Sequence, residues 1–158
     1  MTTPAPRAAG IMVLLVFLAA VMPAAAPAAG PDDILGNWYN QEKDARIEII
    51  KCGANYCGKI VWLKDPNYPE GSKDGVPGTP KVDHHNPDIT RRKAPVLGLQ
   101  IVNDMRYDGG DLWTGGTVYD PKNGKTYKGK MTLVAPAQLD LRGYIGISLI
   151  GRTTSWTR

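Results

Sequence analysis

Apolar and polar residues alternate along short stretches from about residue 35 to the end of the chain, and turn-forming residues separate these stretches. In "TYKGKMTLV" every second residue lies on the same face, namely Tyr127, Gly129, Met131 and Leu133. Period-two alternation is typical of a β-strand with one buried face. The pattern predicts strands near residues 35–41, 45–52, 57–63, 97–103, 111–119, 125–134, 138–144 and 152–157.

The links between these stretches favour an all-β fold. Asn123-Gly124 and the run "DGGD" at 108–111 supply the positive φ angles that tight hairpins need. Glycine and proline interrupt every candidate for a long helix. Hairpin-length links between most strands predict an eight-stranded antiparallel up-and-down barrel, with a two-sheet sandwich as the alternative. Glycines scattered through the strands favour the barrel, because they permit sharp coiling.

The first 28 residues do not continue this pattern. Arg7 precedes an apolar run at 11–21, and the small residues of "MPAAAPAAG" follow it. This order is typical of a secretory signal peptide, and the run is too short to cross a bilayer. We expect cleavage after Ala28, which leaves residues 29–158 as one domain with no membrane span. Acidic and basic residues are mixed without a basic run, which predicts no nucleic-acid partner.

The two cysteines, Cys52 and Cys57, lie between two predicted strands in the part of the chain that would be exported. In an oxidising compartment, an even pair predicts a disulfide. The alternative is a redox or metal-binding pair, which normally leaves two residues between the cysteines rather than four. We therefore expect a cross-strand disulfide that contributes about 2 kcal/mol to stability.

The two ends of the predicted barrel carry "GNW" at 36–38 and "GRTTSWTR" at 151–158. This arrangement resembles lipocalin-like barrels, in which a Gly-x-Trp in the first strand and a late arginine close one end. In such barrels the guanidinium stacks on the indole, an attraction of about 1 kcal/mol. The resemblance gives this structural role to Trp38, Arg152 and Trp156.

Longer motifs resemble the bacterial domain-of-unknown-function family 2147. They are "CGANYCGKIVWLK", "DHHNPD" followed by "APVLGLQI", "GGTVYDPKNGKTYKGKMTL" and "LRGYIGISLIGRTTSWTR", so the resemblance runs from about residue 35 to 158. It implies a small exported protein of the Gram-negative periplasm with a lipocalin-like barrel and no established activity. The family's Asp-x-x-Asn-Pro-Asp motif is matched by Asp83, Asn86, Pro87 and Asp88.

A connection of about thirty residues, 64–96, separates the third and fourth predicted strands. Asp83 and Asn86 can accept backbone hydrogen bonds in Asx-turns, and Pro87 can open a helical turn capped by Asn86. We expect structural roles for Asp83, Asn86 and Asp88, and one or two helical turns in "PDITRRK" across the barrel mouth. Arg91 and Arg92 would there form a solvated basic face, and the alternative is that they attract a carboxylate or phosphate headgroup to the mouth.

His84 and His85 are the two histidines of the chain and fall on unspecified positions of the family motif. Adjacent residues of an extended segment point in opposite directions, so we expect no shared metal ion, and no cofactor. A histidine base would need a nucleophile, and the chain contains no Gly-x-Ser-x-Gly motif. We therefore expect no enzymatic activity, and a loop whose polar groups bond to their own backbone.

Two functions remain open, because an eight-stranded barrel can hold one small ligand or be filled by its own side chains. In the first, the protein binds a small hydrophobic or amphipathic molecule through Trp62, Trp113, Tyr127, Met131, Arg91 and Arg92. In the second, it is a packed structural or interaction module of the cell envelope with an unidentified protein partner. The apolar turn "YIGISLIG" at 144–151 is expected to plug the closed end, with an exposed docking patch as the alternative.

Overall fold

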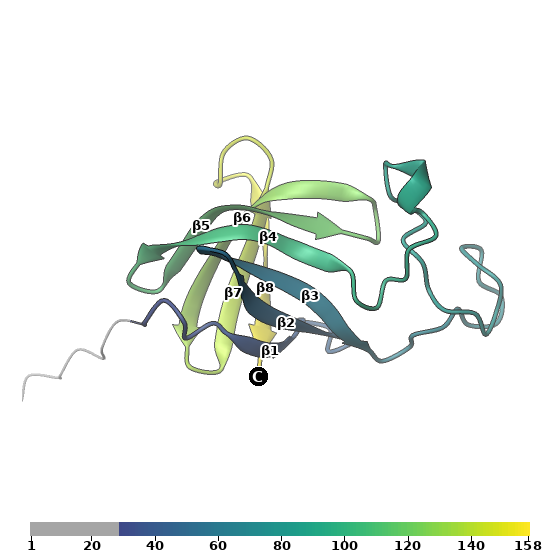
Figure 1. The fold of residues 1–158 in the computed structure, drawn as a ribbon, viewed down its shortest axis with the longest axis horizontal. Helices are drawn as coiled ribbons and strands as arrows, with labels where there is room; N and C mark the ends of the chain where they lie inside the picture. The colour runs from purple at the N-terminus through teal and green to yellow at the C-terminus, as the bar shows by residue number, and fades with distance from the viewer. Residues whose placement is uncertain (1–28) are drawn as a thin grey trace, which may run out of the picture.

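The computed structural model describes residues 29–158, and the expected signal peptide at 1–28 lies outside them. Eight strands form a closed barrel in which each strand pairs antiparallel with the next (Figure 1). They are β1 (Gly36–Tyr39), β2 (Ala45–Cys52), β3 (Asn55–Leu63), β4 (Gln100–Gly109), β5 (Leu112–Asp120), β6 (Lys125–Ala135), β7 (Gln138–Tyr144) and β8 (Gly151–Thr157). The predicted all-β up-and-down barrel is confirmed. Within residues 29–158 no helix is long and apolar enough to span a bilayer.

The barrel closes where Tyr39 of β1 pairs with Thr157 of β8. On β6 and β7 the inward residues follow the predicted alternation. The two strands pair without a shift in this region, so Met131 lies directly opposite Leu141. The fourth strand differs from its predicted bounds of 97–103 and extends to Gly109. Asp104 has a φ of 54° and interrupts the extended backbone, so Val102 and Met105 are both buried. This bulge hides the period-two pattern in the sequence.

One end of the barrel, which we call the closed end, is filled by large side chains. The residues that fill it are fully buried: Ile34, Trp38, Met105, Trp113, Met131 and Leu139. The indole Nε1 of Trp38 donates to the carbonyl of Ile34 at 2.8 Å, and that of Trp113 donates to Pro31 at 3.2 Å. The segment before β1 therefore covers this end and is held there by both tryptophans.

The arginine that stacks on Trp38 is Arg158, with its guanidinium carbon 4.2 Å from the ring centroid. Its nitrogens also donate to the carbonyls of Asp33, Leu35 and Pro136. The expectation that Arg152 makes this stack is wrong, because Arg152 is the second residue of β8 and lies at the opposite end of the barrel. Trp156, the third residue of the expected closure, is also on β8, where it is buried and lines the cavity at the other end of the barrel.

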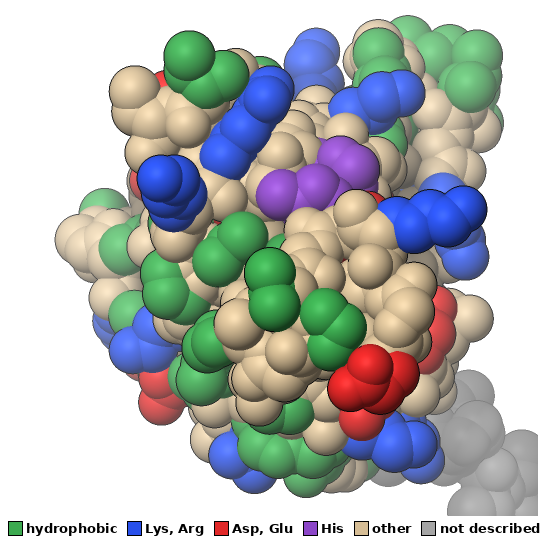
Figure 2. Space-filling view, turned by 90° about the vertical axis from the view of Figure 1, so that its right-hand side faces the viewer, with side chains coloured by type: hydrophobic (Ala, Val, Ile, Leu, Met, Phe, Trp, Pro, Cys, Tyr) green, Lys and Arg blue, Asp and Glu red, His purple; other side chains and the backbone are tan. Residues whose placement is uncertain are grey.

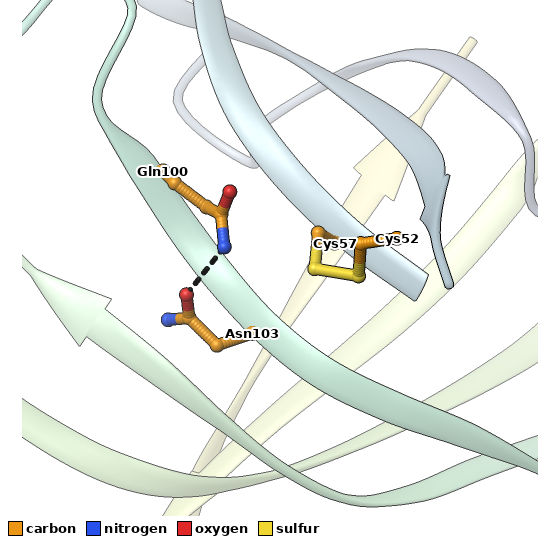
Figure 3. Close-up of a disulfide and its surroundings, with 4 residues drawn as sticks. All are labelled: Cys52, Cys57, Gln100 and Asn103. Carbon is orange, nitrogen blue, oxygen red and sulfur yellow. Dashed lines mark hydrogen bonds between the residues drawn. A yellow bond between two sulfur atoms is a disulfide. The ribbon is translucent and has the colours of Figure 1, made fainter. Parts of the chain in front are cut away.

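Cys52 and Cys57 form a disulfide across the β2–β3 hairpin, as predicted (Figure 3). Cys52 pairs in register with Asn55, and Gly53 adopts the positive φ that the two-residue turn requires. The disulfide lies beside β4, where Gln100 donates to Asn103 at 2.7 Å. It joins two strands near the closed end.

The connection 64–96 extends beyond the barrel at its other end, at the right of Figure 1. It contains one short 3-10 helix, η1 (Ile89–Arg91), whose N-cap is Asp88. The expected cap, Asn86, instead accepts from the backbone N–H of Asp88 in an Asx-turn at 2.9 Å. The helical turn is thus shorter than predicted and starts later, because the Asx-turn occupies the residues before it.

The apolar turn 145–150 between β7 and β8 does not plug the closed end. It lies at the opposite end, and Ile145, Ile147, Leu149 and Ile150 are all exposed. Arg142 holds this turn by donating to the carbonyls of Ser148 and Leu149. The expectation of a plug is wrong, because the segment before β1 already fills the closed end.

Candidate functional site

The end of the barrel opposite Trp38, which we call the open end, contains a cavity of about 1210 Å³. Inward aliphatic residues of five strands line its depth: Ile47, Ile60, Ile101, Val118 and Leu141. Trp156 adds an aromatic surface from β8. Small-molecule pockets are typically a few hundred to about 1,000 Å³ and mostly apolar. The cavity therefore has the size and wall chemistry to hold a small hydrophobic molecule.

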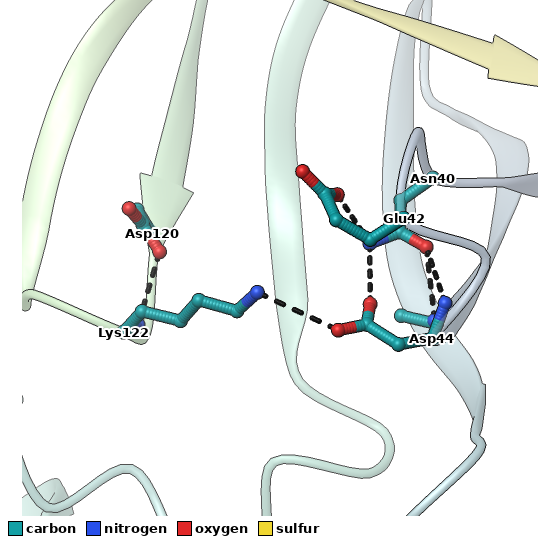
Figure 4. Close-up of polar contacts among 6 residues, drawn as sticks. Asn40, Glu42, Asp44, Asp120 and Lys122 are labelled. Atoms are coloured by element: carbon teal, nitrogen blue, oxygen red, sulfur yellow. Dashed lines mark hydrogen bonds and ion pairs between the residues drawn. The ribbon is translucent and has the colours of Figure 1, made fainter.

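Polar side chains surround the mouth of the cavity. In the β1–β2 turn, the side-chain amide of Asn40 donates to Glu42 and Asp44, and its oxygen accepts from two backbone amides (Figure 4). Lys122, in the β5–β6 turn, reaches across the rim to Asp44 at 3.6 Å. This ion pair links two turns that are far apart in the sequence. An apolar depth beneath a polar rim suits an amphipathic molecule.

The structure brings only part of the predicted ligand set to this cavity. Tyr127 lies in its wall, paired with Val118 across β5 and β6. Trp113 and Met131 are instead packed inside the closed end. Trp62 lies outside the cavity wall and packs edge-on against Tyr39, with ring centroids 5.9 Å apart. The alternation along a strand shows which residues point inward. It does not show whether an inward residue lies in the closed end or in the cavity wall, because each strand has inward residues at both ends.

Arg91 and Arg92 do not line the main cavity. Arg91 borders a separate hollow of about 200 Å³, together with Asn86 and Tyr119. The Nε of Arg92 donates to the carbonyl of Asn86 at 2.7 Å, which ties the end of η1 to the preceding turn. Neither guanidinium is placed to receive the headgroup of a molecule in the barrel.

The turn 83–86 is anchored to the barrel by two buried polar side chains. Asp83 accepts from the phenol of Tyr119 on β5 and from the side-chain amide of Asn86, both at 2.6 Å. Burial and the hydrogen bond to Asp83 raise the pKa of Tyr119, so the phenol stays a donor. Asp83 makes these side-chain contacts in place of the expected Asx-turn. All three side chains fix the connection at the edge of the mouth.

The capping carboxylate of Asp88 also has a perturbed pKa. Hydrogen bonds from the hydroxyl and the backbone N–H of Thr90 lower the pKa of Asp88, and Arg91 lowers it further. Asp88 is therefore a charged N-cap, the role that the sequence predicts for Asn86.

The two histidines lie together at the open end, and both belong to the cavity wall (Figure 2). Their ring centroids are 3.7 Å apart. The expectation that they point in opposite directions is wrong, because they occupy the two central positions of a turn. That turn is closed by the N–H of Asn86, which donates to the carbonyl of Asp83 at 3.0 Å. Asp74 completes a group in which one ligand atom of each residue lies within 4.8 Å of the others.

Several cavity residues were not identified from the sequence. Ile60 and Val118 lie on strands where both faces carry apolar residues, so alternation gives no inward face. Trp156 lines the cavity, whereas the resemblance to lipocalin-like barrels implies that it helps to close the other end.

A closed eight-stranded barrel with one packed and one hollow end is a lipocalin-like barrel. The chain belongs to the bacterial family DUF2147, described as "Uncharacterized protein conserved in bacteria", whose model matches residues 36–158. Among solved structures it is similar to protein HP1028 from the human pathogen Helicobacter pylori, which is described as belonging to the lipocalin family. The TM-score is 0.64 at 21% identity, over 79% of this chain and 82% of that chain. No curated protein matches the chain.

Proposed function

We propose that this protein is exported to the periplasm and there binds a small hydrophobic or amphipathic molecule inside its barrel. The observation that carries the proposal is the cavity of about 1210 Å³, with an aliphatic depth and a polar rim. A solidly packed interaction module would not need this space, since protein interiors are close-packed. The signal-like segment 1–28 supports export. The proposal involves binding and no catalytic step.

The positions of the four tryptophans make binding directly measurable. Trp156 lines the cavity, whereas Trp38 and Trp113 are packed at the closed end and Trp62 lies outside. Titration of palmitate or a fluorescent fatty acid should change the tryptophan emission in a saturable way. Trp156→Phe should remove most of that change while calorimetry still detects binding. Trp62→Phe is the matched control and should leave the change intact.

A second pair of variants tests whether the molecule enters the barrel. Val118 faces the cavity, and its neighbour Thr117 is not part of the cavity wall. Val118→Trp should weaken binding by roughly tenfold or more because it fills the depth, whereas Thr117→Trp should not. Equal affinities in the two variants, or no saturable binding together with a clean apo mass by native mass spectrometry, would contradict the proposal.

A further inference from the structure

We propose that Asp74, His84 and His85 bind one divalent transition-metal ion, of the Zn²⁺ class, at the mouth of the cavity. Two imidazole nitrogens and one carboxylate oxygen are donors that zinc accepts, and three protein ligands leave one position for water or another molecule. The three ligand atoms lie within 4.8 Å of one another. This inference does not depend on the proposed binding of a hydrophobic molecule.

The spacing of the ligand atoms fits a tetrahedral ion. With metal–ligand bonds of 2.0–2.1 Å, the edge of a tetrahedron is about 3.3 Å. The Nε2 of His84 and Oδ1 of Asp74 are 3.4 Å apart, which is long for a hydrogen bond and close to this edge. The widest separation in the group must close by at most about 1.5 Å, which a side-chain rotation can supply.

The Nε2 of His84 is buried and has no hydrogen-bond partner among residues 29–158. A buried polar atom of this kind costs free energy unless something binds it. The contact with Asp74 is an ion pair only when the imidazole is protonated. A metal ion between the two groups would satisfy both the nitrogen and the carboxylate without that protonation.

The backbone holds both histidines in place before any ion binds. The turn that carries them is anchored at each end by the buried residues Asp83 and Asn86. Gly124, in the β5–β6 turn, packs so closely on the carbonyl of His85 that a Cβ at this position would overlap the oxygen. The rings are therefore presented from a rigid segment at the barrel rim, which favours metal affinity.

The third ligand comes from another part of the same connection. Gly75 follows Asp74, and a Cβ at Gly75 would overlap the ring of the buried Tyr68. The phenol of Tyr68 in turn accepts from the N–H of Val82, two residues before His84. A metal ion would thus join two arms of the connection 64–96 that Tyr68 already holds together.

Protein without a histidine tag should bind one Zn²⁺ per chain in a calorimetric titration with zinc chloride. Either His84→Ala or His85→Ala should lower the affinity roughly 100-fold, and Asp74→Asn roughly tenfold. Asp65→Asn is the matched control, because Asp65 is also an exposed acid of the cavity wall and lies outside the group. Co²⁺ should give the intense visible bands of a four-coordinate ion in the wild type, and these bands should be absent from the histidine variants.

Three results would overturn the site: no saturable zinc binding, zinc binding that persists when both histidines are replaced, or an affinity unchanged by Asp74→Asn. The variants replace residues outside the core, and circular dichroism spectra should confirm that each is folded. Palmitate binding measured through Trp156 should persist in the histidine variants. Failure of the metal site is therefore distinguishable from failure of the proposed function.

Discussion

At the closed end of the barrel, Trp38, Trp113 and Met131 fill the space between the strands, whereas the same strands enclose a cavity of about 1210 Å³ at the open end. The strands run between the two ends, with a bulge at Asp104 in β4. The side chains differ between the two ends: Trp38, Trp113 and Met131 meet across the closed end, whereas branched aliphatic chains and one indole, Trp156, surround the open space at the other end. One sheet thus combines a core that stabilises the fold with a wall that is free to contact a ligand.

The two ends also differ in what covers them. At the closed end, the segment before β1 is held by both buried indoles and by Arg158. At the open end, the connection 64–96 and the apolar turn 145–150 lie beside the mouth without filling it. Stability is therefore expected to depend on the closed end, and binding on the open end.

The sharpest test of this comparison uses two leucines on one strand. Leu139 and Leu141 share the inward face of β7, but Leu139 is packed and Leu141 lines the cavity. Leu139→Ala should lower the free energy of unfolding by about 4 kcal/mol, because it creates an enclosed void, and Leu141→Ala by about 2 kcal/mol. Urea denaturation of the two variants measures both values. Equal costs would mean that the open end is packed as tightly as the closed end.

Removal of the disulfide is expected to have the next largest effect. Cys52→Ala with Cys57→Ala should lower the free energy of unfolding by about 2 kcal/mol, because the unfolded chain gains the entropy of a short loop. The bond lies near the closed end, so ligand affinity should stay within about twofold of the wild type. Parallel urea and palmitate titrations check both statements, and a large loss of affinity would show that the two ends are coupled.

Two arginines near the two ends of β8, Arg152 and Arg158, should differ less in their contributions to stability. Arg158→Ala should cost about 1–2 kcal/mol, since it removes the contact with Trp38 and hydrogen bonds to three carbonyls. Arg152→Ala, at the exposed rim, should change stability by less than about 0.5 kcal/mol. Thermal unfolding measures the difference. If Arg152→Ala proves the more damaging variant, the assignment of the closing arginine is wrong.

The sequence predicts the barrel well, because alternation on β6 and β7 and the Asn123-Gly124 turn are local signals. It fails where the outcome depends on contacts between distant residues. The closing arginine could not be chosen correctly, since the position of Arg158 beside Trp38 depends on the register of β8 with β1 and β7.

The candidate site was less predictable than the fold for the same reason. Leu139 and Leu141 have the same parity, and only the side chains of other strands decide which one meets a cavity. The two histidine rings lie together because the backbone turns at 83–86, whereas an extended backbone would separate them. The turn at 83–86 depends on the distant phenol of Tyr119, which the sequence does not place beside Asp83.

The smallest expected effect concerns pH and a tyrosine–aspartate pair at the closed end. Burial and the hydrogen bond to Asp32 raise the pKa of Tyr56 to about 12, from an ordinary value of 10.0. The folded protein therefore keeps a proton that the unfolded chain releases. This contribution to stability is complete below about pH 10 and is lost as the pH rises through about 12. The loss should amount to a few tenths of a kcal/mol at about pH 10 and grow above it.

Urea denaturation from about pH 8 to about pH 11 should show this loss as a falling midpoint. Tyr56→Phe lowers stability at neutral pH, because Asp32 loses a donor, but its midpoint should fall less steeply above about pH 10. Tyr127, at the cavity wall, accepts from the side-chain amide of Asn123 and is the control, so Tyr127→Phe should keep the wild-type slope. If Tyr56→Phe and the wild type have parallel profiles, the phenol of Tyr56 is not held protonated by the closed end, and the alkaline sensitivity arises elsewhere in the barrel.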